Sequence, residues 1–180
     1  MLCGMPVTIE KHDRICVIQM NRPEKRNAIN PEMTLALDAA LNEFEDDDDL
    51  WVAILTGYGE GFCAGTDLAE SSGPRTERGG EYGVIRRSRR KPLIAAVEGM
   101  ALGGGMEIVL ACDLVVASAS ATFGLPEARR GVIATCGGLF RAQRALPLNI
   151  ARQILLTGEP ISADISRSRL PARSGERGDR

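Results

Sequence analysis

Apolar and β-branched residues gather in two short runs near the N-terminus of the chain. These runs are Pro6–Glu10 and Ile15–Met20, and the polar residues Lys11–Arg14 separate them. Short apolar runs on either side of a polar turn are typical of the two strands of a β-hairpin. We therefore expect a hairpin here, with His12, the only histidine of the chain, in its turn.

The pattern then changes to a helical period. Asn30 precedes Pro31, as at the start of a helix with an asparagine N-cap and a proline at its first position. The apolar residues that follow recur at roughly helical spacing: Leu35, Leu37, Leu41 and Phe44. We expect the acidic run Glu45–Asp49 to end this helix as a solvated connection, because no separate ligand joins it to make a metal site.

Short apolar runs alternate with glycine-rich turns over the rest of the chain. We expect strands at Trp51–Thr56 and Leu93–Val97, a helix at Gly104–Ala111, and a third, buried strand at Leu114–Ala117. Strands that alternate with helices predict parallel βαβ units and an α/β fold. No internal repeat is apparent.

Composition narrows the class of protein. With 180 residues, 44% apolar and 26% charged, the chain fits a single globular domain. A net charge of −2 gives no reason to expect a nucleic-acid partner. The apolar runs are too short to span a bilayer, and the first residues lack the pattern of a secretory signal. We therefore expect a cytoplasmic protein with no membrane partner.

The five cysteines are odd in number and widely spaced, and no Cys-x-x-Cys pair occurs. A disulfide framework or a zinc site is therefore not expected. Cys63 and Cys136 lie beside glycine-rich loops, where a nucleophile is the alternative interpretation. We favour buried or loop thiols, because the single histidine offers no Cys–His pair.

Three segments that follow strands carry the candidate chemistry: Gly57–Leu68, Glu98–Gly105 and Phe123–Glu127. Ligands of α/β proteins bind beyond the C-terminal ends of parallel strands. Gly103–Gly105 lies at a helix start, where free N–H groups favour negative charge. Together with Glu107 and Glu127, these glycines have the groups needed to stabilise an enolate and move protons around it. The glycine run alone is more often only a turn, and it matches neither a dinucleotide fingerprint nor a P-loop.

Several motifs in order resemble the enoyl-CoA hydratase/isomerase (crotonase) superfamily. They are Asn21-Arg22-Pro23, Asn27-Ala28, Phe62–Leu68, Lys91–Glu107, Ala111-Cys112-Asp113 and Phe123–Glu127. The resemblance runs from about residue 6 to residue 164. It implies a crotonase-like ββα superhelix in a core domain at residues 1–164. It also implies an acyl-CoA thioester as substrate, no separate cofactor because coenzyme A is part of that substrate, and the homotrimer of typical members.

The resemblance also assigns roles to residues. It places an oxyanion hole at the backbone N–H groups of Thr66 and Gly104, and the hydratase pair of carboxylates at Glu107 and Glu127. Members that only isomerise double bonds commonly lack the first carboxylate, so both together favour reversible addition of water across the 2,3 double bond. The residues expected along the coenzyme A path are Ala64, Gly65, Asp67, Leu68 and Gly103. No metal is implied.

Two further segments bear on the substrate. Arg75–Lys91 carries seven basic residues against Glu77 and Glu81. A solvated, mobile surface is its simpler interpretation, and attraction of the coenzyme A phosphates is the alternative. Gly131–Arg141 resembles the corresponding segment of carnitinyl-CoA dehydratase-like members, which suggests a substrate other than a simple fatty enoyl-CoA.

The end of the chain departs from the family pattern. Residues 165–180 have no amphipathic period and little apolar content, so we expect a disordered tail in place of most of the family's C-terminal helical region. Nineteen arginines against three lysines suggest a GC-rich coding sequence, in which a frameshift would produce such a tail. The coding DNA would decide this. The competing hypothesis for the protein is a catalytically impaired family member that only binds CoA esters.

Overall fold

A computed structural model describes residues 4–164, and it begins with the predicted hairpin. Strands β1 (Val7–His12) and β2 (Ile15–Met20) pair antiparallel. The turn is only two residues long, and Asp13 takes a left-handed conformation there, with φ of 51°. His12 is therefore the last residue of β1, paired with Ile15, and our placement of it in the turn is wrong.

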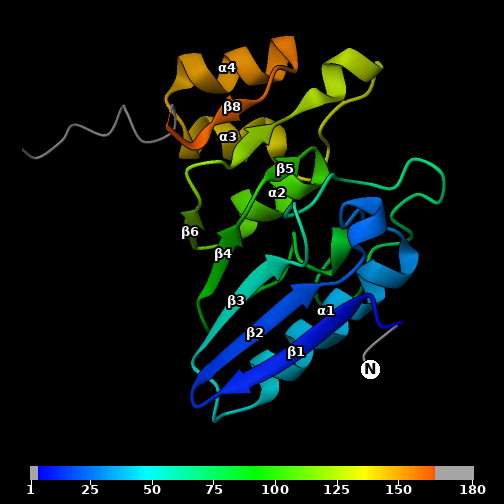
Figure 1. Ribbon diagram of the computed structural model, residues 1–180, viewed down its shortest axis with the longest axis vertical. Coiled ribbons are helices and arrows are strands. Elements are labelled where there is room, and N and C mark those ends of the chain that lie inside the picture. The colour runs from blue at the N-terminus through cyan, green and yellow to red at the C-terminus, as the bar shows by residue number, and fades with distance from the viewer. Residues whose placement is uncertain (1–3, 165–180) are drawn as a thin grey trace, which may run out of the picture.

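The hairpin opens a five-stranded sheet that is parallel from β2 onward (Figure 1). Strands β3 (Val52–Gly57), β4 (Leu93–Val97) and β6 (Leu114–Ala117) follow in the order β1-β2-β3-β4-β6. The α/β prediction is confirmed. Helix α1 (Pro31–Asp46) connects β2 to its parallel neighbour β3.

Helix α1 begins as its sequence predicts. Asn30 is the N-cap, and its side-chain oxygen accepts a hydrogen bond from the Met33 N–H group at 2.9 Å. The buried stripe of α1 includes Met33, Leu37, Leu41 and Phe44. Leu35 is 60% exposed, so its expected place in that stripe is wrong. It is two residues from Leu37, and residues two apart do not share a face of a helix.

A second, three-stranded sheet follows the first. It contains β5 (Met100–Leu102), β7 (Thr122–Gly124) and β8 (Ile161–Ser162), and helix α2 (Gly104–Ala111) follows β5. Helices α3 (Gly138–Ala145) and α4 (Leu148–Thr157) lie with β8 at the end of the molecule opposite the hairpin (Figure 1). Residues 4–164 also contain three short 3₁₀ turns: η1 (Pro23–Lys25), η2 (Glu81–Gly83) and η3 (Pro126–Arg130).

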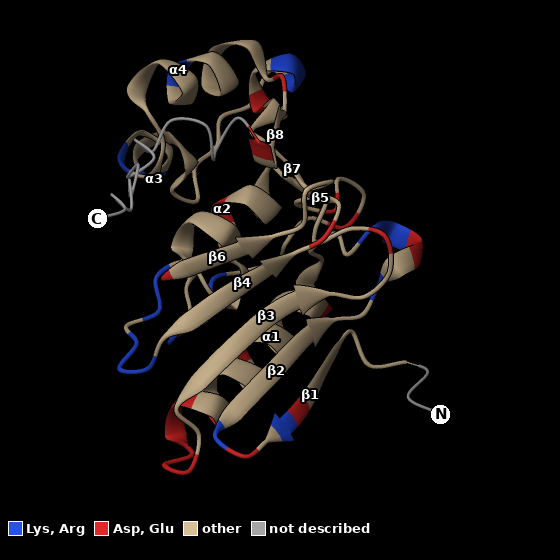
Figure 2. Cartoon of the chain, turned by 60° about the vertical axis from the view of Figure 1, so that its left-hand side comes forward, with Lys and Arg blue, Asp and Glu red and all other residues tan. Residues whose placement is uncertain are grey.

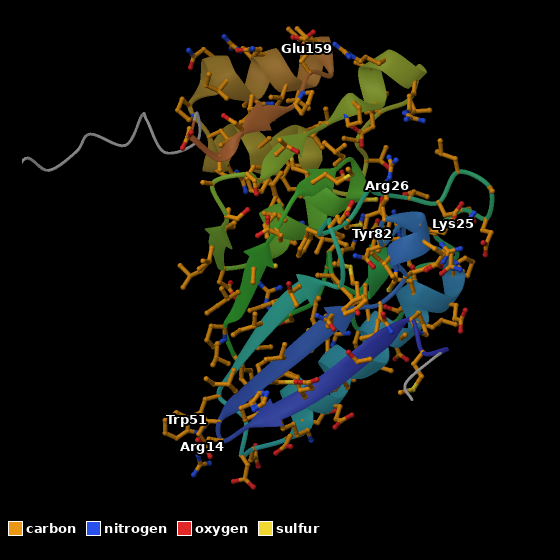
Figure 3. The ribbon with its side chains drawn as sticks, viewed as in Figure 1. Arg14, Lys25, Arg26, Trp51, Tyr82 and Glu159 are labelled. Carbon is orange, nitrogen blue, oxygen red and sulfur yellow. The ribbon has the colours of Figure 1, made fainter. Side chains whose placement is uncertain are left out.

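Two apolar segments are more exposed than expected. All four residues of β6 are exposed, among them Val116 at 65%, so the expectation of a buried strand is wrong. The reason is position, because β6 is the edge strand and pairs only with β4. Trp51 precedes β3 and is 63% exposed, with the Arg14 guanidinium 5.0 Å from its ring (Figure 3).

The arginines of Arg75–Lys91 pair with carboxylates of the fold, and the side chains of Arg75, Arg86 and Arg90 are still 63%, 61% and 72% exposed. Its ion pairs are Arg75 and Arg86 with Glu81, Arg78 with Asp46, Arg87 with Asp38, Arg89 with Asp113, and Arg90 with Glu45. Arg87 is only 8% exposed and Glu45 only 4% exposed. The charged side chains of the basic stretch and of the acidic run at the end of α1, both coloured in Figure 2, therefore mostly face solvent as expected, but most of them are paired, and Arg87 and Glu45 are buried.

Residues 165–180 lie outside the described residues, so the predicted tail and the division at residue 164 stay predictions. Among the described helices, none combines the length and the hydropathy needed to cross a membrane.

Candidate active site

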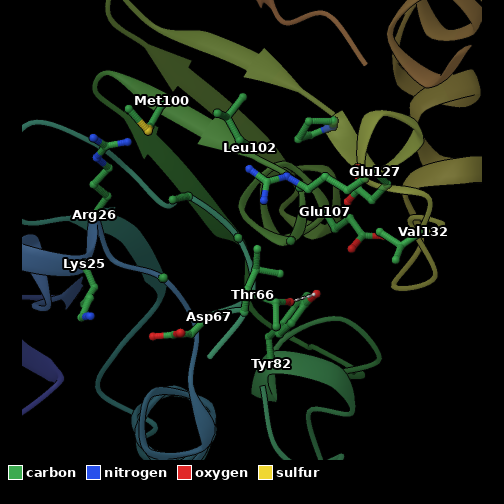
Figure 4. A pocket seen from close by; sticks show the side chains of 18 of the residues that line it. Lys25, Arg26, Thr66, Asp67, Tyr82, Met100, Leu102, Glu107, Glu127 and Val132 are labelled. Atoms are coloured by element: carbon green, nitrogen blue, oxygen red, sulfur yellow. Dashed lines mark hydrogen bonds between the residues drawn. The ribbon is translucent and has the colours of Figure 1, made fainter. Parts of the chain in front are cut away.

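A cavity of about 570 Å³ is lined by all nine of the site residues that the family resemblance assigns (Figure 4). Lining it are the predicted residues Ala64, Gly65, Thr66, Asp67, Leu68, Gly103, Gly104, Glu107 and Glu127. They come from the loop after β3, the start of α2 and the 3₁₀ turn η3. The chain thus brings together residues up to 63 positions apart.

The loop after β3 packs directly on the segment that starts α2. The Leu102 N–H group donates to the Cys63 carbonyl at 3.0 Å. Gly65 has φ of 99°, and a Cβ there would lie 2.9 Å from the Leu102 carbonyl oxygen and 3.1 Å from the Gly104 nitrogen. Only glycine accepts both this conformation and this approach. The close packing brings the backbone of Thr66 next to that of Gly104.

Two backbone N–H groups remain without a partner at this junction. Within residues 4–164, neither the Thr66 N–H nor the Gly104 N–H donates a hydrogen bond to the protein. The Gly104 amide is free because Gly104 is the first residue of α2, whose opening N–H groups have no carbonyl one turn earlier. The positive end of the α2 dipole adds to the attraction for negative charge.

Glu107 lies in the first turn of α2 and is only 2% exposed. Its Oε1 atom accepts a hydrogen bond from the Gly138 N–H at 2.9 Å, so α3 fixes the position of the carboxyl group. Burial, with the nearby Glu127 charge, raises the pKa of Glu107 to about 7, although the Gly138 N–H acts in the opposite direction. Near neutral pH this group can therefore both donate and accept a proton.

Glu127 lies in the first turn of η3 and is half-buried. Burial raises its pKa above the ordinary range, and the positive charge of Arg130 opposes the shift. Its Oε2 atom is buried and has no hydrogen-bond partner among the described residues. An unpaired buried carboxyl oxygen is costly, and a ligand or a water held in the cavity would satisfy it.

Asp67 holds the loop after β3 in place through an ion pair, and Leu68 lies at the exposed rim of the cavity. The Asp67 carboxylate accepts a hydrogen bond from Arg22 at 2.7 Å, and this ion pair holds its pKa below the ordinary value. Its charge thus holds the loop to the start of η1. Leu68 is 76% exposed at the rim of the cavity.

The structure adds residues that sequence reasoning missed. Lys25 and Arg26 line the cavity on the side opposite the two glutamates (Figure 4). Their position between Asn21-Arg22-Pro23 and Asn27-Ala28 was an available signal, because both of these motifs belong to the resemblance. Tyr82 also lines the cavity, and nothing in its sequence context indicated this.

The cysteines near the site are not activated thiols. Cys63 is completely buried beneath the loop after β3, and burial raises its pKa to about 12. Burial also raises the pKa of Cys136. A thiol is a weak nucleophile when its pKa is raised, so the preference for buried or loop thiols agrees with the structure.

The chain is similar to known proteins over most of its length, not only at the site. The (E)-benzylidenesuccinyl-CoA hydratase of Thauera aromatica is 43% identical over 168 residues, which are 89% of this chain and 65% of that protein. The short-chain-enoyl-CoA hydratase of Clostridium acetobutylicum is 39% identical over 166 residues, which are 88% of this chain and 64% of that protein. The chain thus spans somewhat less than two thirds of the length of these curated relatives.

Solved structures share the fold. A probable enoyl-CoA hydratase/isomerase from Mycobacterium abscessus aligns with a TM-score of 0.84 at 45% identity, over 91% of this chain and 66% of that one. A carnitinyl-CoA dehydratase from Mycobacterium avium 104 aligns with a TM-score of 0.86 at 44% identity, over 91% of this chain and 67% of that one. The enoyl-CoA hydratase/isomerase family model matches residues 10–168, and the chain belongs to this family.

Proposed function

We propose that the chain carries the active site of an enoyl-CoA hydratase, which adds water reversibly across the 2,3 double bond of an enoyl-CoA thioester. One observation carries the proposal. Two unpartnered backbone N–H groups and two carboxyl groups with raised pKa values line the same cavity. Family membership and the hydratase names of the relatives support it.

The two N–H groups have the chemistry of an oxyanion hole. Attack of water on the 3-carbon of a conjugated enoyl thioester moves negative charge onto the thioester oxygen. The Thr66 and Gly104 amides would donate to that oxygen, and they stabilise the enolate more than the ground-state carbonyl because its charge is larger. Loss of one such donor typically costs about 3–4 kcal/mol of transition-state stabilisation.

The two glutamates supply the proton transfers. One carboxylate takes a proton from the attacking water, and the other carboxyl group, in its protonated form, gives a proton to the 2-carbon. The pKa of Glu107, raised to about 7 by burial, suits either task, because a general acid or base works best when its pKa is near the working pH. Burial shifts the pKa of Glu127 in the same direction. The hydrogen bond from Gly138 would hold Glu107 in place during the reaction.

The other side of the cavity suits the coenzyme A part of the substrate. Lys25 and Arg26 are exposed on this side, and the described residues offer neither of them an ion-pair partner. We propose that they attract the phosphates, and that Ala64, Gly65, Asp67, Leu68 and Gly103 line the path between the phosphates and the thioester. The alternative assignment of the phosphates to Arg75–Lys91 is weaker, because none of its basic residues lines the cavity.

The acyl end of the cavity favours a second candidate substrate. Val132, Ile133 and Thr135 line it, and they belong to Gly131–Arg141, the segment similar to carnitinyl-CoA dehydratase-like members. A solved neighbour carries that name. Crotonobetainyl-CoA is therefore the second substrate to test beside crotonyl-CoA.

The test replaces each glutamate by its uncharged isostere. We expect Glu107→Gln and Glu127→Gln each to lower kcat by about 10²–10⁴-fold, because each removes one proton-transfer group, while binding of the CoA ester is retained. The measurement is the loss of enoyl-thioester absorbance, with binding followed by calorimetry and assembly by sizing. Near-normal turnover in either variant contradicts the roles. A wild-type chain that binds both esters without turnover supports the competing binding function.

A further inference from the structure

The Tyr82 hydroxyl lies at the junction between the two free amides. It forms a hydrogen bond with Thr66 Oγ1 at 3.0 Å, drawn as a dashed line in Figure 4. It also lies close to Gly104, because a Cβ on Gly104 would be 2.7 Å from the Tyr82 hydroxyl oxygen. One side chain therefore touches both residues of the proposed oxyanion hole.

The geometry of the Thr66 peptide explains what this contact does. The Gly65 carbonyl oxygen accepts a hydrogen bond from the Ile29 N–H at 2.8 Å. Because a trans peptide is planar, this bond directs the Thr66 N–H of the same peptide unit to the opposite side. The Asp67 N–H donates to the Ile29 carbonyl at 2.8 Å, so the backbone on both sides of Thr66 is tied to Ile29. Gly65 is permissive, so the tilt of the Thr66 peptide about this line depends on a third contact. The Tyr82 hydroxyl supplies that contact through the Thr66 side chain.

The backbone of Tyr82 is strained, and its surroundings hold it in that conformation. It has φ of 57° and ψ of 9°, a left-handed conformation that costs a residue other than glycine about 1–2 kcal/mol. Such strain persists only where the surroundings determine it, and it gathers at functional sites. Next to it, a Cβ on Gly83 would lie 2.7 Å from the Thr34 carbonyl and the Asp38 nitrogen, so η2 is pressed onto α1.

A further contact connects this tyrosine to the acid–base side of the cavity. The Cys136 side chain lies beside both the Tyr82 hydroxyl and the Glu107 carboxyl group. Burial raises the pKa of Tyr82, so its hydroxyl remains neutral and does not act as a base. The contacts thus run from Thr66 through Tyr82 and Cys136 to Glu107.

We propose that Tyr82 is a positioning residue: its hydroxyl fixes the Thr66 peptide against Gly104, so that both N–H groups point at one oxygen. The inference rests on the proposed oxyanion hole and names the group that sets its geometry. It predicts an effect on the polarised thioester rather than on affinity, because Tyr82 acts through Thr66.

The test uses Tyr82→Phe, which removes only the hydroxyl oxygen. Tyr58→Phe is a matched control, because Tyr58 is the other tyrosine of the chain, is 54% exposed and does not line this cavity. Two quantities are measured for each variant. The first is kcat. The second is the absorption of a bound cinnamoyl-CoA thioester with an electron-donating ring group, whose maximum moves to longer wavelength when its carbonyl is polarised. This shift reports the oxyanion hole directly.

For Tyr82→Phe we expect kcat to fall about 10-fold or more and the long-wavelength shift to shrink, with the dissociation constant of the ester changing less than about 3-fold. The effect on kcat should stay below that of losing a whole donor, about 10²–10³-fold, because the N–H group is misaligned rather than absent. Tyr58→Phe should change neither measurement.

A second variant approaches the same hydrogen bond from Thr66, without altering the strained turn. Thr66→Val should reproduce the loss of shift and Thr66→Ser should restore it, and Tyr82→Phe combined with Thr66→Val should be no worse than either alone. Tyr82→Phe with unchanged kcat and unchanged shift overturns the inference. A wild-type chain that polarises the ester without hydrating it overturns the proposed reaction alone.

Discussion

At the scale of single residues, Glu107 shows how a site shapes stability. Its pKa in the folded chain is about 7, whereas an ordinary glutamate has a value of 4.5. Because burial disfavours the charged form, the folded state binds more protons than the unfolded state between these values. The stability due to this group is therefore fully present below about pH 4.5 and is lost as pH rises through about 7.

We predict that Glu107→Gln removes this loss. Glutamine cannot ionise, and its side-chain oxygen can still accept the hydrogen bond from Gly138. Relative to wild type, the free energy of unfolding of the variant should therefore increase between pH 5 and pH 8. The increase should be roughly 3 kcal/mol at most, because each pKa unit corresponds to about 1.4 kcal/mol. Urea unfolding at the two pH values measures it, and a constant difference between the proteins contradicts it.

At the scale of elements, the start of α2 is placed by packing rather than by helix propensity. Gly105 is in the first turn of α2, where propensity alone would make alanine more stable by about 1 kcal/mol. A Cβ at Gly105, however, would overlap the carbonyl oxygen of Cys63. That carbonyl also accepts the Leu102 hydrogen bond that aligns the two loops, so it cannot move away without breaking the junction.

We predict that Gly105→Ala destabilises the fold by about 2 kcal/mol or more, as overpacking against rigid backbone does, and lowers kcat. Gly131→Ala is the comparison, because a Cβ there meets no atom within 4 Å and only the left-handed conformation is penalised. Thermal unfolding and kcat of both variants show whether overpacking against the Cys63 carbonyl or the helix propensity of alanine dominates at Gly105. A stabilised Gly105→Ala would show that propensity wins.

The elements also show how far the sequence determines the fold and the site. The ranges of β2, β4, α2 and β6 follow from local apolar runs, and the predictions match the observed bounds. The second sheet was missed because its strands have only two or three residues, too few for a period to appear. The exposure of β6 depends on its place at the edge of the sheet, and the position of Tyr82 depends on a strained turn. A local sequence pattern records neither of these.

At the scale of the whole molecule, charges divide into two groups. The cations of Arg75–Lys91 pair with carboxylates of the fold or, for Lys91, with the carbonyl oxygens of Phe44 and Asp47. Lys25 and Arg26 instead stand at the cavity with no such partner in the described part of the chain. A net charge of −2 therefore conceals a local positive field at the place where an anionic ligand would enter.

We predict that Arg26→Gln raises the KM for a CoA ester several-fold at low salt and leaves kcat nearly unchanged, because the lost charge lies far from the reacting atoms. The effect should weaken with added salt, since the Debye length falls from about 30 Å at 0.01 M to about 8 Å at 0.15 M. Arg78→Gln is the matched control: it removes the same charge, but Arg78 already pairs with Asp46. If Arg78→Gln changes the salt dependence of KM and Arg26→Gln does not, the phosphates bind at the basic stretch, because only charge near the phosphates can respond in this way.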